Sequence, residues 1–314
     1  MEVPLDLIST GANAYLSDMT FPNDDMTAQF LLPDRPVVGR LVRLGDAADE
    51  ILSRHAYPEP VANLLGEALA LAALVGGSLK FDGRLIVQAQ GDGPVSYLVV
   101  DYDTDGALRG YCKFDPERVA AASQGFVRPG AETLLGQGAF VMTVDRGEDM
   151  GRTQGAAPIQ GETLALCAET YFNQSEQLPT RVVLGVAKVD GKWRAGGVMI
   201  QLIAPDDLRG STEEAWDHAR AIVNTLAEDE LTDPKLSTEA LMFRLFHEDG
   251  VRLLPGKPLA AQCRCSQDRV EGMIRSFEPE AVAEMVEPDG QVHVTCEFCS
   301  RTYQVAPPEV GASA

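Results

Sequence analysis

Four of the six cysteines lie in two tight pairs near the C-terminus, and this arrangement constrains the chain more than any other feature. Cys263 and Cys265 occur in the segment AAQCRCSQDRV, and Cys296 and Cys299 follow in HVTCEFCSRTY. Four thiolates in two close pairs predict one tetrahedral zinc site of the structural kind. The module around them is too small to rest on its own core, so bound metal would supply folding free energy. We therefore expect residues 259–314 to be folded with zinc and largely unfolded without it.

A helix–helix–hairpin pattern surrounds the two cysteine pairs. Ser266 is expected to cap one helix, and Pro279 begins a second. An Asp-Gly turn at 289–290 then leads into the strand QVHVTC, with RTYQV as its partner. His293 is a rival ligand three residues before Cys296, but on an alternating strand the two side chains face opposite sides. We expect the four cysteines to be the ligands.

The pattern of residues 1–205 predicts a mixed α/β core with an antiparallel sheet. For the whole chain we expect an α+β fold. Segments 58–76 and 161–177 have apolar residues at helical spacing. Between them, GRLIVQAQ, VSYLVVDY and ALRGYCKF read as strands joined by Asp-Gly turns, and RVVLGVAKV with KWRAGGVMIQLI forms a later hairpin. Gly196-Gly197 indicates a bulge or a close backbone approach. The polar segment YFNQSEQLPT is interpreted as a helix end packed in the core.

Residues 206–258 differ in composition from the preceding segment, with twelve acidic and six basic side chains. A capping box at Ser211–Glu214 opens one amphipathic helix, and a second follows in STEALMFRLFHED. We expect no strand here and no core belonging to this segment alone. The helices must therefore rest on another part of the protein, which makes the segment a metastable linker.

Composition limits the classes of partner. The formal charge of −21 repels phosphate backbones and anionic membranes, so we expect neither nucleic acid nor membrane as a partner. The N-terminus lacks the features of a secretory signal, and the apolar stretch 64–77 is shorter than a membrane span and carries Glu67. We read the protein as cytoplasmic, where paired cysteines indicate metal binding or redox chemistry. Cys112 and Cys167 are expected to be buried and unreactive.

Three functions are compatible with the cysteine pattern. An inert zinc ribbon would serve as a docking or regulatory module. A redox switch would use the short spacings, because each pair can form a local disulfide once the metal has left. A thiol oxidoreductase would use Cys296-x-x-Cys299, but the surrounding sequence lacks a thioredoxin-like βαβ pattern. Spacing alone does not separate the first two, and no other catalytic motif is present in the sequence.

Five further motifs, in order along the chain, identify a resemblance. The sequence resembles the redox-regulated 33 kDa chaperonin family (heat-shock protein 33) over nearly its whole length. Besides the Cys-x-Cys-Ser and Cys-x-Phe-Cys segments, the similarity rests on YPEPV, LKFDG, QAQGDGP, YFNQSEQLPT and AGGVMIQ.

The resemblance implies a non-enzymatic chaperone of the stress response in three parts: a core domain at 1–205, a helical linker at 206–258 and a zinc-binding redox-switch domain at 259–314. Such proteins hold one zinc ion and are inactive when reduced. Oxidation forms two disulfides, which map to Cys263–Cys265 and Cys296–Cys299, and releases the zinc. The linker then unfolds, and the protein binds unfolding clients without ATP and dimerises through the core domain.

The linker offers the apolar surface that such a chaperone would expose. Its helices are expected to be buried against the core only while the cysteine module holds them down. The side chains that become candidates for client contact are Trp216, Val223, Leu226, Leu241, Leu245 and Phe246.

Overall fold

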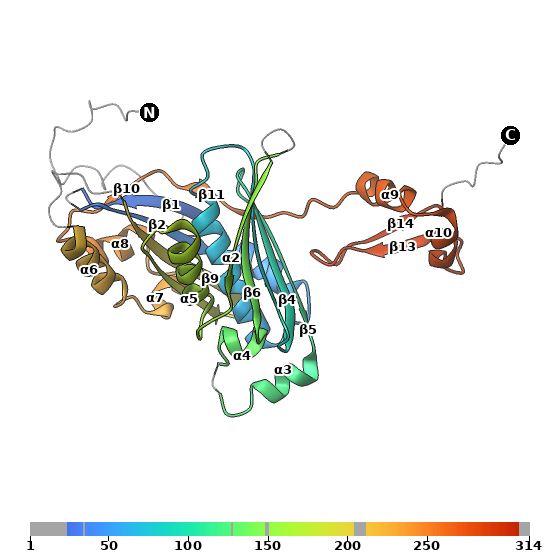
Figure 1. Cartoon of the computed structure of the whole chain (residues 1–314), viewed down its shortest axis with the longest axis horizontal. Coiled ribbons are helices and arrows are strands. Elements are labelled where there is room, and N and C mark those ends of the chain that lie inside the picture. The colour runs from blue at the N-terminus through green and yellow to red at the C-terminus, as the bar shows by residue number, and fades with distance from the viewer. Residues whose placement is uncertain (1–23, 34, 127, 148–150, 204–211, 308–314) are drawn as a thin grey trace.

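Two mainly antiparallel sheets form the body of the protein (Figure 1). The computed structural model describes residues 24–33, 35–126, 128–147, 151–203 and 212–307. The first sheet has the spatial order β10 (Arg252–Leu253), β1 (Met26–Leu31), β2 (Val37–Leu44), β9 (Lys192–Leu202), β8 (Thr180–Val189), and β11 (Lys257–Pro258) also pairs with β1. The second has the order β12 (Ala260–Ala261), β5 (Ala107–Phe114), β4 (Val95–Asp103), β3 (Arg84–Gly91), β6 (Gly138–Asp145), β7 (Arg152–Pro158). The α+β fold expected from the sequence is confirmed.

A central helix, α2 (Glu59–Gly76), packs between the two sheets (Figure 1). A helix that is apolar on all sides is stable in water only when it is surrounded by protein. Among the described residues, α2 alone is long and apolar enough to cross a membrane, but 83% of it is buried inside the protein. The apolar stretch 64–77 is the C-terminal part of this longer helix with its cap residue, and the burial of α2 makes it a core helix.

The other helices described between residues 24 and 203 pack around this body. They are α1 (Asp46–Ser53), α3 (Pro116–Ala122), α4 (Ala131–Leu135) and α5 (Leu164–Tyr171), the last continued by a π-helix (Phe172–Glu176). The helix end expected in YFNQSEQLPT is present: Tyr171 and Phe172 are buried, and Gln177 stops the helix in a left-handed conformation. The Asp-Gly turn between β8 and β9 is also confirmed, with positive φ at both Asp190 and Gly191.

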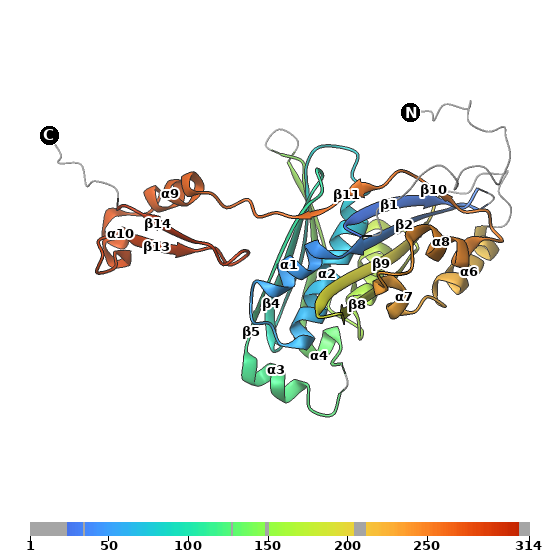
Figure 2. The same ribbon diagram turned by 180° about the vertical axis from the view of Figure 1, so that it is seen from behind.

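Three helices from the expected linker segment lie on the outer face of the first sheet (Figure 2). They are α6 (Thr212–Val223), α7 (Glu228–Thr232) and α8 (Thr238–Phe246). The expectation that this segment contains no strand was wrong, because β10 and β11 pair with β1. Such two-residue strands leave no hydrophobic alternation in a sequence. Ser211, the expected first residue of the capping box, lies outside the described residues.

Two glycines let the backbone of α7 approach the sheet closely. Gly185 in β8 and Gly196 in β9 are cross-strand partners. A Cβ atom on Gly185 would lie 2.9 Å from the backbone oxygen of Glu228, and one on Gly196 would lie 2.8 Å from that of Leu231. The close approach expected at Gly196 is thus present, and the register of β9 with both of its neighbours runs without a bulge.

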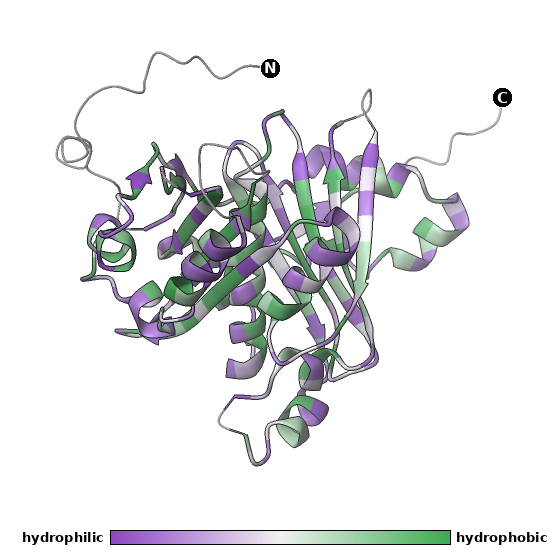
Figure 3. Cartoon of the chain, turned by 60° about the vertical axis from the view of Figure 1, so that its left-hand side comes forward, coloured by the Kyte–Doolittle hydropathy of each residue, from purple (hydrophilic) through white to green (hydrophobic). Residues whose placement is uncertain are grey.

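The C-terminal residues form a small separate unit of two helices and a hairpin, at the right of Figure 1. Its elements are α9 (Gln267–Arg275), α10 (Pro279–Met285), β13 (Val292–Thr295) and β14 (Thr302–Val305). Hydrophobic and hydrophilic residues are mixed along this unit, as they are along the strands of the main body (Figure 3). Its core has six buried members, namely Val270, Ile274, Val282, Val292, Tyr303 and Val305.

Candidate metal centre

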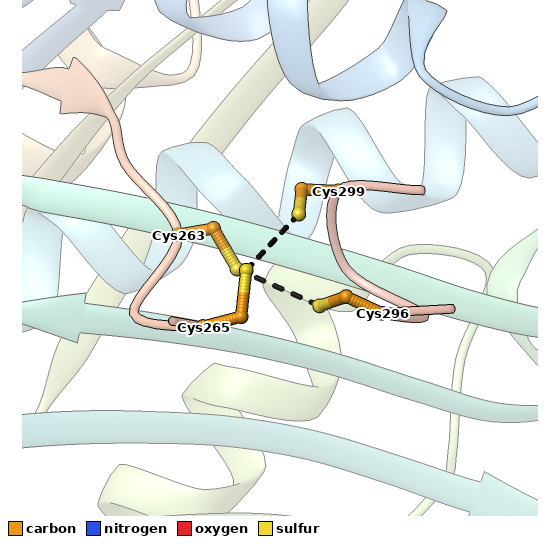
Figure 4. A group of neighbouring side chains, drawn as sticks. All are labelled: Cys263, Cys265, Cys296 and Cys299. Atoms are coloured by element: carbon orange, nitrogen blue, oxygen red, sulfur yellow. Dashed lines mark hydrogen bonds between the residues drawn. The ribbon is translucent and has the colours of Figure 1, made fainter. Parts of the chain in front are cut away.

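Two loops bring the four paired cysteines together (Figure 4). Cys263 and Cys265 lie between β12 and α9, where the Ser266 side chain accepts a hydrogen bond from the backbone N–H of Arg269 and starts the helix. Cys296 and Cys299 lie in the turn between β13 and β14. The turn closes because the Ser300 N–H donates to the Cys296 oxygen at 2.8 Å.

The sulfur positions suit one tetrahedral ion. The Sγ atoms of Cys263 and Cys296 are 3.7 Å apart, and those of Cys265 and Cys299 are 3.3 Å apart. All four ligand atoms lie within 4.8 Å of one another, and all four cysteines are free thiols. Zinc bonded to four sulfurs at about 2.3 Å separates those sulfurs by about 3.8 Å. The cluster therefore has the size and the donor set of a zinc site.

Ionisation of the cluster requires a compensating cation. Burial by itself raises the pKa of Cys263, but hydrogen bonds from the Cys265 backbone and from neighbouring thiols outweigh it and lower that pKa to about 7. Burial raises the pKa of Cys296, and the nearby Cys263 thiolate raises it further. Burial also raises the pKa of Cys299. Like charges at this separation oppose each other, so four thiolates are stable together only around a positive ion.

Other side chains complete the surroundings of the cluster. The Tyr303 hydroxyl donates to Cys265 Sγ at 3.1 Å and ties the second strand of the hairpin to the first cysteine loop. His293, the rival ligand, stands outside the group of four and has its Nε2 atom 2.7 Å from Asp289 Oδ2. Hydrogen bonding to Asp289 raises the pKa of His293.

Cys112 and Cys167 stand outside the cluster and are buried, as expected. Cys112 lies in β5 with 1% of its surface exposed, and Cys167 lies in α5 with 0% exposed. Burial raises the pKa of both thiols. A thiol that stays protonated is a poor nucleophile, so both burial and the raised pKa disfavour reaction at these two residues.

The linker side chains singled out from the sequence lie against the first sheet. Val223, Leu241 and Phe246 are fully buried, and Leu226 is 7% exposed. Trp216 and Leu245 are partly buried beside them. Phe246 contacts Phe30 of β1, with ring centroids 5.3 Å apart. All six are therefore covered or half-covered in this conformation.

Sequence reasoning missed the polar residues that attach these parts to the core. Arg43, fully buried in β2, donates hydrogen bonds to the backbone oxygens of Asp233 and Leu236. Arg194 in β9 donates through Nε to the Thr232 oxygen at 2.7 Å. An arginine within an otherwise apolar strand could have predicted these contacts, because a buried guanidinium requires hydrogen-bond acceptors.

Comparison with known proteins places the chain in a family. The family model for Hsp33 protein matches residues 25–306. The 33 kDa chaperonin of Caulobacter vibrioides is 66% identical over 289 residues, which cover 91% of this chain and 96% of that protein. The 33 kDa chaperonin of Ectopseudomonas mendocina is 37% identical over 285 residues, covering 89% and 92% respectively.

A solved structure supports the fold. The crystal structure of the 33 kDa chaperonin (heat shock protein 33 homolog) from Thermotoga maritima matches with a TM-score of 0.75, covering 91% of this chain and 96% of that chain at 21% identity. The fold, the cysteine cluster and the match of the family model over most of the sequence lead to one conclusion: this chain belongs to the Hsp33 family of chaperones.

Proposed function

We propose that this protein is a redox-regulated, ATP-independent holdase that keeps unfolding proteins from aggregating. The observation that carries the proposal is the cluster of four free thiols, spaced for a single metal ion, in a small unit that follows the linker. The linker helices meanwhile bury apolar side chains against the core. A change at the cysteines can therefore alter how much apolar surface the protein exposes.

In the reduced protein, Cys263, Cys265, Cys296 and Cys299 would hold one zinc ion. Zinc keeps the thiols deprotonated and contributes its binding free energy to the fold of residues 259–314. Six buried side chains are a small core for that unit. Removal of the ion should therefore unfold it while leaving the two-sheet core intact.

Oxidation would convert the four thiols into two disulfides, Cys263–Cys265 and Cys296–Cys299. For each pair, one hydrogen peroxide molecule accepts two electrons, one S–S bond forms, and the peroxide oxygens leave as two water molecules. Disulfide sulfur is no longer a thiolate ligand, so the zinc is released together with the stabilisation that it supplied.

Unfolding of the switch domain at 259–314 would release the linker at 206–258 from the core at 1–205. The linker residues Trp216, Val223, Leu226, Leu241, Leu245 and Phe246, with the sheet face beneath them, would then be exposed to clients. Release would also let the core domain form a homodimer. The net charge of −21 keeps client complexes soluble and disfavours nucleic acid and membranes as partners, in line with a cytoplasmic, non-enzymatic role.

Zinc release and client protection, measured side by side, test this function. Reduced and peroxide-treated protein at elevated temperature is mixed with a thermally unfolding client, whose aggregation is followed by light scattering. We expect protection only after zinc release. A Cys112→Ser variant serves as the control and should behave like the wild type. Retention of zinc under peroxide would favour an inert docking module, and equal protection by the reduced form would contradict the switch.

A further inference from the structure

The cysteine loops rest against one edge of the second sheet, at strands β4 and β5. Strand β12 pairs with β5 in parallel, and the Gln262 N–H donates to the Leu108 oxygen at 2.9 Å. The Ser300 hydroxyl donates to the backbone oxygen of Arg54 at 3.3 Å. In Figure 4, two strands of this sheet pass directly behind the four cysteines. The unit is therefore docked on the core at a defined position.

One buried carboxylate organises the contact. Asp101 in β4, with 5% of its side chain exposed, accepts hydrogen bonds from the guanidinium groups of Arg109 and Arg264. Arg109 comes from β5 in the core, whereas Arg264 lies between Cys263 and Cys265. Arg264 also reaches Asp103, with its Nε atom 3.4 Å from Oδ2. The first cysteine loop is thus fixed to the core through the residue between its two thiols.

Arg109 extends the contact to both cysteine loops. Its guanidinium carbon lies 4.0 Å from the centre of the Phe298 ring, in the turn between Cys296 and Cys299. Cys263 also lies within electrostatic reach of this guanidinium. A cation over an aromatic ring is attracted to it, and a guanidinium beside thiolates offsets their negative charge.

Tyr111, two residues along β5, supports the same turn. Its ring centroid lies 6.3 Å from that of Phe298, and its hydroxyl donates to a Glu297 carboxylate oxygen at 3.4 Å. Both cysteine loops therefore meet side chains that belong to the core.

We propose that the core domain is an outer-sphere partner of the metal centre: Asp101 holds Arg109 and Arg264 against the two cysteine loops, so that docking of the unit and retention of metal by the cysteines stabilise each other. This deepens the proposed function and rests on its zinc site. Residues that orient metal ligands from outside raise metal affinity, and a coupling between two events is reciprocal. Loss of the metal then releases Arg264 from Asp101 and weakens the pairing of β12 with β5. The core is affected in this way without a direct contact between the linker helices and the cysteines.

The test is Asp101→Asn in the full-length reduced protein. Zinc affinity is measured by chelator competition, and docking is measured by hydrogen exchange of the Gln262 amide. We expect zinc to bind about 10-fold more weakly and the Gln262 amide to exchange faster. Asp105→Asn is the control, because it makes the same charge change in the adjacent turn, where its side chain accepts a hydrogen bond from the Ala107 N–H.

A second variant keeps the test independent of the stability of the core. Phe298→Leu removes the ring under Arg109 and leaves all four cysteines in place. We expect it to weaken zinc binding too, and the double variant with Asp101→Asn to lose less than the sum of the single losses. Unchanged zinc affinity and unchanged exchange in both single variants would overturn the inference. Failure of the oxidised wild type to protect a client would instead overturn the proposed function and leave these two measurements interpretable.

Discussion

Gly185→Ala should release the linker without any change at the cysteines. A Cβ at this position would lie 2.9 Å from the Glu228 backbone oxygen, whereas ordinary contact begins at 3.4 Å, so α7 must move outward. Overpacking of this kind costs about 1–3 kcal/mol, which weakens linker docking about 5- to 150-fold. The strand itself is not harmed, because alanine is favoured over glycine in a strand by about 0.5–1 kcal/mol.

The displacement also strains the hydrogen bonds that hold α7 from its other end. The Arg194 Nε–H reaches the Thr232 oxygen at 2.7 Å, and that distance must lengthen when the helix shifts. We expect reduced Gly185→Ala protein to keep its full zinc content, to be cleaved faster by protease between residues 212 and 249, and to protect a heat-unfolded client in part without oxidant. Gly185→Val should show a larger effect in each assay. Gly272→Ala in α9 is the control, because a Cβ there meets no atom within 4 Å.

Two results would refute this reasoning. Cleavage of the linker at the wild-type rate would mean that the close approach of α7 does not limit docking. Fast cleavage with retained zinc and no client protection would mean that linker release is not the activating event, and that exposure of another surface must be.

Three other predictions concern single side chains. Arg43→Met leaves the backbone oxygens of Asp233 and Leu236 without their donor, which costs about 1–3 kcal/mol for each oxygen. Protease should therefore cleave the linker faster while the zinc content stays constant. Unchanged cleavage would contradict the role of Arg43. Burial raises the pKa of Glu67 from 4.5 to about 7, so the folded state holds a proton that the unfolded chain releases, and the free energy of unfolding should fall as pH rises between these values. Glu67→Gln should flatten that slope in thermal unfolding at pH 5 and 7.5, and an unaltered slope would exclude Glu67 as its source. After chelation of the metal, iodoacetamide at pH 7.5 should label the four clustered cysteines, and it should label Cys112 and Cys167 only once the core is denatured. Peptide mass spectrometry identifies the labelled residues. Early labelling of Cys112 or Cys167 would contradict their burial.

Periodicity identified the elements that bury a regular face. The central helix and the hairpins of β3–β5 and β8–β9 follow from apolar spacing and Asp-Gly turns. Strand β7 was missed because its side chains are mostly exposed and it lies at a sheet edge, held by backbone pairing to β6. Strands β10 and β11 were missed because two residues are too few to show any period.

The candidate site was predictable only in its local part. Two short cysteine spacings are visible in a sequence, and they were sufficient to expect that the four thiols would meet. The docking contact was not visible, because Asp101 and Arg264 are 163 residues apart and come together only through the pairing of β12 with β5. Nothing in the sequence pattern predicts that an arginine between two cysteines will contact an Asp-x-Asp segment at the end of a distant strand.

Arginines form polar contacts at both junctions: Arg43 and Arg194 beneath the linker are buried, and Arg109 and Arg264 beside the cysteine unit are half-buried. Arg43 and Arg194 of the core bind the linker backbone, and Arg264 of the cysteine unit binds Asp101 of the core beside Arg109. Buried charged contacts fix one geometry because an unpaired partner is costly, yet their net contribution to stability is small once desolvation is counted. An apolar interface of equal size would bind more tightly and tolerate more registers. The docked position of the cysteine unit is thus specified by polar contacts whose net stabilisation is modest, so the loss of one metal ion is a sufficient perturbation to undo that contact.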